Sequence, residues 1–291
     1  MKISKHHVHK FESVPEFVAA CTKRAKSSAA SHNRSSGFTG TKSFDEAVKL
    51  ASDGWSDVRP QVDAILEPLR EKLAEVLDVT VERWHDIIGS DPDIDRFVAG
   101  EFECMWDDIH IPTPTNGKVF TLLLSNAVNC NVSTETILKR GAALAAMVEA
   151  FTIMGCELEI WVETSSRDFG GGWYGDDGRE REVFSTLVCV HKAGDNLDVN
   201  NVMFPLGHPS WLRRLWFGFA EGATQAQIEH FGFIHGGYGQ AFDEPTLDRE
   251  VGASIVLAMG ANQNWAQGED TVAWILNQLK MQGVWQDPNE G

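Results

Sequence analysis

The stretch that decides the fold is KVFTLLLSNAVNCNVSTETILKRGAALAAMVEAFTIMGCELEIWV, residues 118–162. It begins with Val119–Leu124, a short and nearly continuous apolar run that is typical of a buried parallel strand. A polar loop follows, and then an apolar pattern with helical spacing over Thr134–Met154, with Ser133 as its N-terminal cap. Glu157–Val162 has the pattern of the next strand. The stretch therefore predicts a β-loop-α-β unit with two parallel strands and a right-handed crossover.

Strand and helix patterns continue to alternate after this unit. We expect further strands at Val183–His191 and Ser254–Met259, and further helices at Ser210–Phe219 and Thr271–Gln282. Such alternation favours an α/β fold with a mostly parallel sheet and helices on both faces. The order of strand, loop, Ala-rich helix and strand distantly resembles the von Willebrand factor A-type topology. We assign this α/β core to residues 118–285.

The segment before the core, residues 43–117, is predicted to be a helical region. Ser43 followed by Glu46 three residues later is a typical helix start. Apolar residues at helical spacing then predict a second helix over Val62–Leu77. The last residues, 286–291, are expected to form a disordered tail.

Residues 1–42 form a basic N-terminal segment. They carry eight basic and two acidic side chains, a balance of +6, whereas the other 249 residues carry 17 basic and 40 acidic ones, a balance of −23. We expect a short helix around Val14–Ala20 as an N-terminal helical extension, and a flexible Ser- and Gly-rich loop over 27–42. A basic segment on a chain of net charge −17 suggests a polyanion contact, and a solvated arm is the alternative.

The composition restricts the class of protein. Five widely spaced cysteines without a CxxC pair favour reduced thiols in a cytoplasmic compartment over a disulfide framework or a cysteine zinc site. The absence of 18 consecutive apolar residues predicts that nothing spans a membrane. Neither HExxH nor GxSxG occurs, so no catalytic residue is assigned and binding is expected rather than catalysis.

The loop after Leu124 lies where parallel sheets place ligands, at the carboxyl end of a strand. In von Willebrand factor A-type domains this loop reads Asp-x-Ser-x-Ser and holds a divalent cation. Here it reads SNAVN over residues 125–129, without the leading Asp, and hard cations normally need a carboxylate. The sequence therefore predicts no metal and no cofactor.

Basic and aromatic side chains supply candidates for contact with unpaired nucleic acid. They come from the basic segment, from the start of the long helix, from the Gly-rich loop over 167–181, and from a short helix flanked by Trp211 and Trp216. A structural role is the alternative for each. The candidates are Lys23, Arg24, Lys26, Arg34, Lys42, Lys139, Arg140, Trp173, Tyr174, Arg213 and Arg214.

Three stretches together resemble a phage-encoded protein family. Ser43–Trp55 follows SFxEAxxLAxxGW, Asp93–Cys104 follows DxxRFxxGxPEC, and Ser133–Val162 contains RGAAxAAL and GxxxEIW. The chain departs from these patterns at Phe102, where Pro is expected, and at Met147, where Leu is expected. Within this family the chain is similar to the Drc-type single-stranded-DNA-binding RNA polymerase cofactors of podoviruses that carry a virion RNA polymerase.

This resemblance implies single-stranded DNA and a phage RNA polymerase as partners, a role in early and middle transcription, and a location in the host cell cytoplasm. It transfers no DNA-contacting residue by motif. Two alternatives stay open, a metal-dependent nuclease or hydrolase acting at the loop after Leu124, and a protein–protein adaptor with a degenerate von Willebrand A-like fold. The oligomeric state is also open, with a homo-oligomer among the alternatives.

Overall fold

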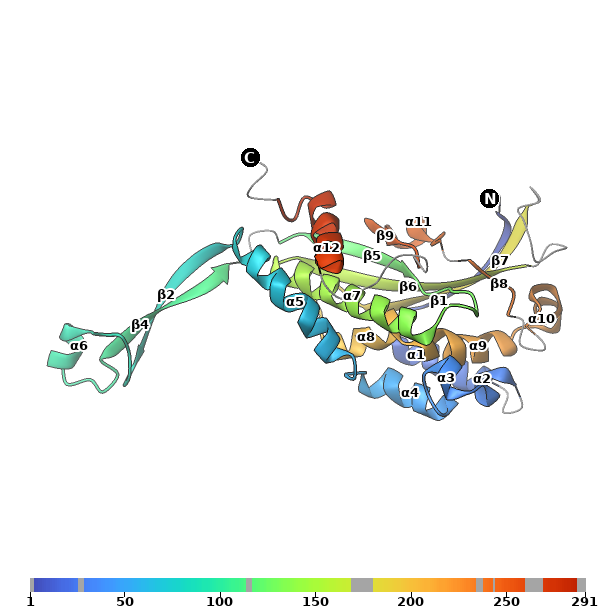
Figure 1. Ribbon diagram of the computed structural model, residues 1–291, viewed down its shortest axis with the longest axis horizontal. Helices are drawn as coiled ribbons and strands as arrows, with labels where there is room; N and C mark the ends of the chain where they lie inside the picture. Colours follow the sequence, from blue (N-terminus) through green and yellow to red (C-terminus); the bar gives the residue numbers. More distant parts are fainter. Residues whose placement is uncertain are drawn as a thin grey trace.

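A six-stranded sheet forms the centre of the molecule (Figure 1). The computed structural model describes residues 3–25, 29–113, 117–168, 180–233, 238–242, 244–259 and 269–286. The strand order is β1-β7-β6-β5-β9, and β8 pairs with β6. The strands are β1 (Ile3–Phe11), β5 (Val119–Ser125), β6 (Glu157–Arg167), β7 (Arg181–His191), β8 (Gln240–Phe242) and β9 (Ile255–Leu257).

The sheet is mostly parallel, as the sequence predicts. β5 pairs in parallel with β6 and with β9, and β1 pairs in parallel with β7. Only the pairs β6–β7 and β6–β8 are antiparallel among the described strands of this sheet. Leu122 lies opposite Ile160 on one side and Ile255 on the other, which sets the register of the predicted β-loop-α-β unit.

Helices flank the sheet, and most of them lie on one face. In Figure 1, α1, α7, α8 and α9 run below the strands, and α11 lies above them. The helices of the body are α1 (Val14–Arg24), α2 (Ala30–Asn33), α3 (Ser36–Thr39), α4 (Phe44–Asp53), α5 (Arg59–Ala74), α7 (Thr134–Ile153), α8 (Val199–Gly207), α9 (Phe217–Glu221), α10 (Gln225–Phe231), α11 (Asp248–Val251), α12 (Glu269–Met281) and the π-helix η1 (Trp211–Trp216).

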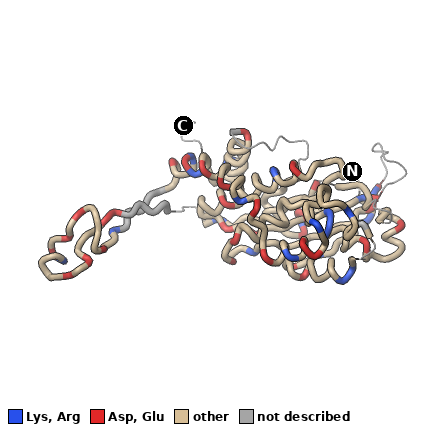
Figure 2. The backbone as a smooth tube through the Cα atoms, turned by 60° about the horizontal axis from the view of Figure 1, so that its bottom comes forward, with Lys and Arg blue, Asp and Glu red and all other residues tan. Residues whose placement is uncertain are grey.

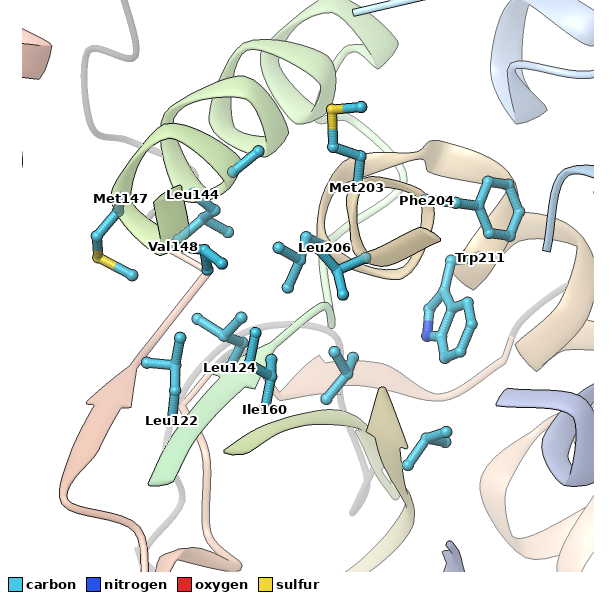
Figure 3. Close-up of a cluster of buried hydrophobic side chains, with 14 of the residues drawn as sticks. Leu122, Leu124, Leu144, Met147, Val148, Ile160, Met203, Phe204, Leu206 and Trp211 are labelled. Carbon is cyan, nitrogen blue, oxygen red and sulfur yellow. The ribbon is translucent and has the colours of Figure 1, made fainter. Parts of the chain in front are cut away.

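Helix α7 is the central helix of the core. Twelve of its residues are buried, because it packs against the sheet and against α5, α8 and α12, and its exposed positions are Glu135, Lys139 and Thr152. Figure 3 shows Leu122 and Leu124 of β5 and Ile160 of β6 below Val148 of α7 and Leu206 of α8. Burying each such side chain contributes about 1.5–3 kcal/mol.

Two glycines set the distance between α7 and α8. A Cβ at Gly141 would lie 2.5 Å from the Gly207 Cα, and a Cβ at Gly207 would lie 2.1 Å from the Gly141 Cα. Both contacts are far inside van der Waals separation, so only glycine permits this approach. Because α8 ends at Gly207 and η1 begins at Trp211, the glycine contact also fixes where η1 starts.

The N-terminal segment is part of the folded body. Residues 3–11 form the edge strand β1, for which the sequence carried no prediction. The loop over 27–42 was expected to be flexible, but its described residues, 29–42, contain α2 and α3, which corrects that expectation. The predicted helix starting at Val14 is confirmed as α1, and the Ser43 hydroxyl caps α4 by accepting from the Glu46 N–H at 3.0 Å. There is thus no domain boundary at residue 42.

An antiparallel arm projects from the body (Figure 1). It is built from β2 (Asp78–Asp86), β3 (Asp91–Pro92), α6 (Ile94–Val98) and β4 (Met105–Thr113), and β4 pairs with both β2 and β3. The prediction of a helical region over 43–117 is therefore right for α4 and α5 and wrong for this arm.

Replacing Gly141 by Ala tests the helix contact. The added methyl collides with backbone, so the free energy of unfolding is expected to fall by about 1–3 kcal/mol, although Ala alone favours a helix by about 1 kcal/mol. Gly37→Ala in α3 is the matched control, because nothing lies within 4 Å of the position that its Cβ would take. Urea denaturation of both variants measures the difference, and equal stability of the two would contradict the role of the contact.

His208 predicts loss of stability in acid. Burial lowers the pKa of His208 to about 4, and its Nδ1 accepts from the Ser210 N–H at 3.1 Å. The unfolded chain therefore binds the extra proton between pH 6.5 and 4, so stability present above pH 6.5 is lost as the pH falls, by up to about 3 kcal/mol. Urea midpoints at pH 7 and pH 4.5 should differ less in His208→Asn than in the parent chain. A parallel pH response in both would show that another group is responsible.

Candidate functional site

A cavity of about 430 Å³ lies at the carboxyl ends of β5 and β6, beside η1. This is the sheet edge at which the sequence places a ligand-binding loop, and residues 127–130 of that loop form part of the wall. The cavity is lined by Arg34, Phe38, Ala127, Val128, Asn129, Cys130, Ser165, Ser166, Arg167, Leu212, Arg213, Trp216, Phe217, Tyr238, Gly239, Gln240 and Ala241.

The lining is cationic in an acidic chain. It contains three arginines, Arg34, Arg167 and Arg213, and no Asp or Glu among the described residues, whereas the whole chain has a net charge of −17. Arg34 is exposed, and the Arg167 Nε donates to the Gln240 side-chain oxygen at 3.0 Å. A wall with three guanidinium groups favours an anionic ligand.

Aromatic rings share this wall. Phe217 and Tyr238 stack with centroids 3.6 Å apart and planes 7° from parallel. The guanidinium carbon of Arg213 lies 4.1 Å from the Phe38 ring centroid, and that of Arg34 lies 5.8 Å from it. Trp216 is 1% exposed, and its indole Nε1 has no hydrogen-bond partner among the described residues. The cavity wall therefore combines cations with flat rings.

Tyr238 is held in a strained conformation at this cavity. Its φ is +48°, the one positive value for a non-glycine residue in the described part of the chain, which costs about 1 kcal/mol or more. Its hydroxyl donates to the buried Glu221 carboxylate, which also accepts from the Ser31 N–H at 2.8 Å. Burial and the neighbouring Glu221 raise the pKa of Tyr238 far above its ordinary value, so the phenol stays protonated and keeps donating.

The two arginines of η1 hold the N-terminal segment against the body. Arg214 is fully buried, and its Nη1 donates to the carbonyls of Ser31 (2.7 Å) and His32 (2.9 Å). Its Nη2 donates to the carbonyls of Arg34 and Thr41, both at 3.0 Å. Four backbone acceptors around one charged group fix the path of residues 31–41.

Arg213 likewise holds the rim of the cavity in place through hydrogen bonds to backbone carbonyls. It is 1% exposed as a whole residue and donates to the carbonyls of Phe38 (2.8 Å) and Val132 (2.6 Å). Burial lowers the pKa of Arg213 to about 10, so the group is still charged at neutral pH. It thereby joins the loop after β5 to the N-terminal segment and lends positive charge to the cavity.

Arg140 is a structural residue and not a DNA contact. It is buried in α7, where its Nη2 donates to the carbonyls of Ser125 at 2.8 Å and Ala258 at 3.3 Å. Burial lowers the pKa of Arg140 to about 9. The guanidinium ties together the carboxyl ends of β5 and β9, and this burial corrects its place among the candidates for contact with nucleic acid in favour of the structural alternative. Arg214 requires the same correction.

The other predicted side chains are dispersed. Lys23, Lys42 and Lys139 are exposed but do not line the cavity, and Lys139 pairs with Glu135 at 2.8 Å. Arg24 packs over the Phe219 ring at 4.0 Å. Lys26, Trp173 and Tyr174 lie outside the described residues.

Of the predicted set, the structure brings Arg34 and Arg213 together at the cavity, and sequence reasoning missed most of their neighbours. Arg167 stands near the end of a strand, and Phe217 directly follows a short helix, so neither carries a motif. The signal for Tyr238 was its place in a Gly-Gly-Tyr-Gly run over 236–239, which permits unusual backbone angles.

Three further observations concern the described part of the chain alone. It contains no group of three or more His, Cys, Asp or Glu side chains arranged to hold a metal ion. No helix in it has the length and apolar character needed to cross a bilayer. All five cysteines are free.

Comparison with known proteins gives one match. Residues 1–284 match the family model described as a domain of unknown function, DUF7192. No curated protein and no solved structure matches the chain. The match covers the arm, the sheet and the cavity together, so it treats them as one unit.

Removing the Arg214 guanidinium should release the N-terminal wall of the cavity. Arg214→Met leaves four carbonyls without their donor, and we expect a loss of at least about 2 kcal/mol of stability together with faster amide exchange over residues 29–42. Hydrogen–deuterium exchange measures the second effect. Lys23→Met, at an exposed position, is the control for charge removal. Unchanged exchange over 29–42 in the Arg214 variant would refute the anchoring role.

Proposed function

We propose that this chain, which belongs to the DUF7192 family, binds single-stranded nucleic acid by seating one nucleotide unit in the cavity beside η1. The observation that carries the proposal is the described lining itself, three arginines and four aromatic rings without any acidic side chain. Such a wall supports binding, because guanidinium groups and flat rings contact phosphates and bases without a chemical step.

Phosphate is the group that Arg34 fits, while Arg167 and Arg213 add positive charge to the wall. Guanidinium groups form paired hydrogen bonds to phosphate oxygens, and Arg34 is exposed at the rim where a backbone phosphate would arrive. Because acidic groups elsewhere repel a polyanion, the strand would be directed to this wall. Affinity should consequently decrease with added salt.

An unpaired base fits the rest of the cavity. A volume of about 430 Å³ is within the range of roughly 300–1,000 Å³ that is typical of small-ligand sites, which admits one nucleotide but not a duplex. Phe38 is half-buried at the wall and offers a ring edge or face to a base. Bases in a duplex are already stacked and paired, so the single strand is preferred.

We also propose that the natural strand is DNA and that an RNA polymerase receives the protein–DNA complex. Both proposals rest on the sequence resemblance. The cavity chemistry suits either nucleic acid, because stacking and phosphate contacts do not distinguish them. In the proposed role the chain holds opened DNA while the polymerase acts on it, and it performs no chemistry itself.

Substitutions at the cavity test the proposal. Phe38→Leu should weaken binding of a labelled single strand of about 20 nucleotides by about 1–3 kcal/mol if the ring stacks on a base. Arg34→Ala should reduce the salt dependence by about 0.7 in the slope of log K against log salt, as expected for one phosphate contact. Fluorescence anisotropy at several salt concentrations measures both quantities.

Lys49→Ala on α4 is the control, because it removes an exposed cation that does not line the cavity. It should leave the affinity unchanged apart from a small general charge effect. Duplex DNA of the same sequence provides the second comparison. Equal affinity for duplex and single strand, or full affinity in both cavity variants, would defeat the proposal.

A further inference from the structure

The tip of the arm, residues 83–108, exposes apolar side chains on a scale that the rest of the described chain does not match. Phe102 is 89% exposed, Ile88 85% and Val98 79%. Seven of the twelve large apolar side chains that are exposed among the described residues lie in this tip; they are Trp84, Ile87, Ile88, Ile94, Phe97, Val98 and Phe102. Exposed apolar clusters of this kind mark interaction sites.

The tip is also strongly acidic. Residues 83–108 contain eight Asp or Glu and two Arg, a balance of −6. Figure 2 shows red segments spread along the arm, well away from most of the blue segments of the body. The apolar side chains are therefore surrounded by negative charge.

Hydrogen bonds hold the tip in a defined shape. Asp93 caps α6 by accepting from the Arg96 N–H at 3.2 Å, and its side chain also pairs with His85 at 3.1 Å. The Ser90 N–H donates to Asp107 at 2.7 Å. The exposed apolar side chains are thus held by a folded backbone. This preorganisation lowers the conformational entropy that is lost when a partner covers them.

We propose that the arm tip docks into an apolar groove on another protein whose rim carries Lys and Arg. The apolar residues of α6 and its flanking turns enter the groove, as an amphipathic helix does in helix-in-groove recognition. The acidic residues around them face the basic rim, which steers association and fixes orientation. This interaction is separate from the cavity and does not depend on strand binding there.

Charge argues against three other occupants. If the tip docked on the tip of a second copy of this chain, two surfaces that each carry a net charge of −6 would face each other. They would repel each other. Nucleic acid would be repelled for the same reason. An anionic bilayer would be repelled as well, which leaves neutral lipid as the membrane to examine.

Peptide display on the full-length protein tests the proposal. A random peptide library is selected on the parent chain and depleted on the arm variant Phe97→Ser/Val98→Ser/Phe102→Ser, whose three changes lie at exposed positions and leave the core intact. We expect enrichment of peptides that combine aromatic or aliphatic residues with Lys or Arg. Their affinity should fall at least tenfold in the arm variant.

Two controls separate the arm from other effects. Val119→Ser/Met281→Ser removes comparably exposed apolar groups from the body and should retain peptide binding. Arg34→Ala should also retain it, so failure of nucleic-acid binding and failure of arm docking give different results. Asp91→Asn/Glu103→Gln should weaken peptide binding and flatten its salt dependence, since both acids are exposed at the tip.

Four outcomes would overturn the proposal. They are the absence of arm-dependent peptides, enrichment of peptides without basic residues, arm-dependent dimerisation in sedimentation velocity, and arm-dependent flotation with phosphatidylcholine vesicles. Enrichment of basic apolar peptides, lost in the arm variant alone, supports it.

Discussion

The buried guanidinium of Arg214 is the contact on which the candidate site depends. Folding removes this charge from water, and four carbonyls from residues 31–41 replace the lost hydration. An uncompensated buried cation would be costly, so η1 and the N-terminal segment must come together or neither is stable. The path of residues 31–41 is therefore set by an electrostatic requirement rather than by their own weak helical propensity.

The cavity follows from this requirement. With residues 31–41 fixed, Phe38 meets Arg213 and Arg34 reaches the rim, while Gly141 and Gly207 hold α8, the helix before η1, against α7. Glu221 then positions Tyr238 through its hydroxyl. Its negative charge is directed at Ser31 and Tyr238, so the described cavity wall itself stays free of acidic groups. The two neighbouring arginines of η1 thus both hold backbone segments in place, and Arg213 in addition lines the cavity.

Local pattern determined how much the sequence could predict. The β5-α7-β6 unit was predictable because its apolar periodicity, its cap at Ser133 and its turn are all local signals. The edge strand β1 was not predictable, because its many histidines and lysines do not give the apolar pattern of a strand, although it pairs with β7. The arm was missed because its narrow three-stranded sheet buries little and so carries a weak apolar signal. For the site, the sequence found Arg34 and Arg213 but could not separate them from Arg140 and Arg214. All four are arginines near polar loops. Arg34 differs from the others by its exposure, whereas Arg213 is as deeply buried as Arg140 and Arg214 and differs from them only in lining the cavity.

Two surfaces of opposite character stand far apart on this fold. The cavity lies among η1, α3 and the sheet edge, and the arm tip lies at the far end of the projecting ribbon in Figure 1. The cationic wall of the cavity attracts a polyanion, and the acidic tip of the arm repels it. The tip attracts a basic protein surface, and the cationic wall repels that surface. Each surface therefore excludes the other's ligand, and the distance between them prevents direct competition. Under the two proposals the chain would hold a nucleic-acid strand and a basic protein at once, because the charge that directs each ligand to its own surface also keeps it from the other.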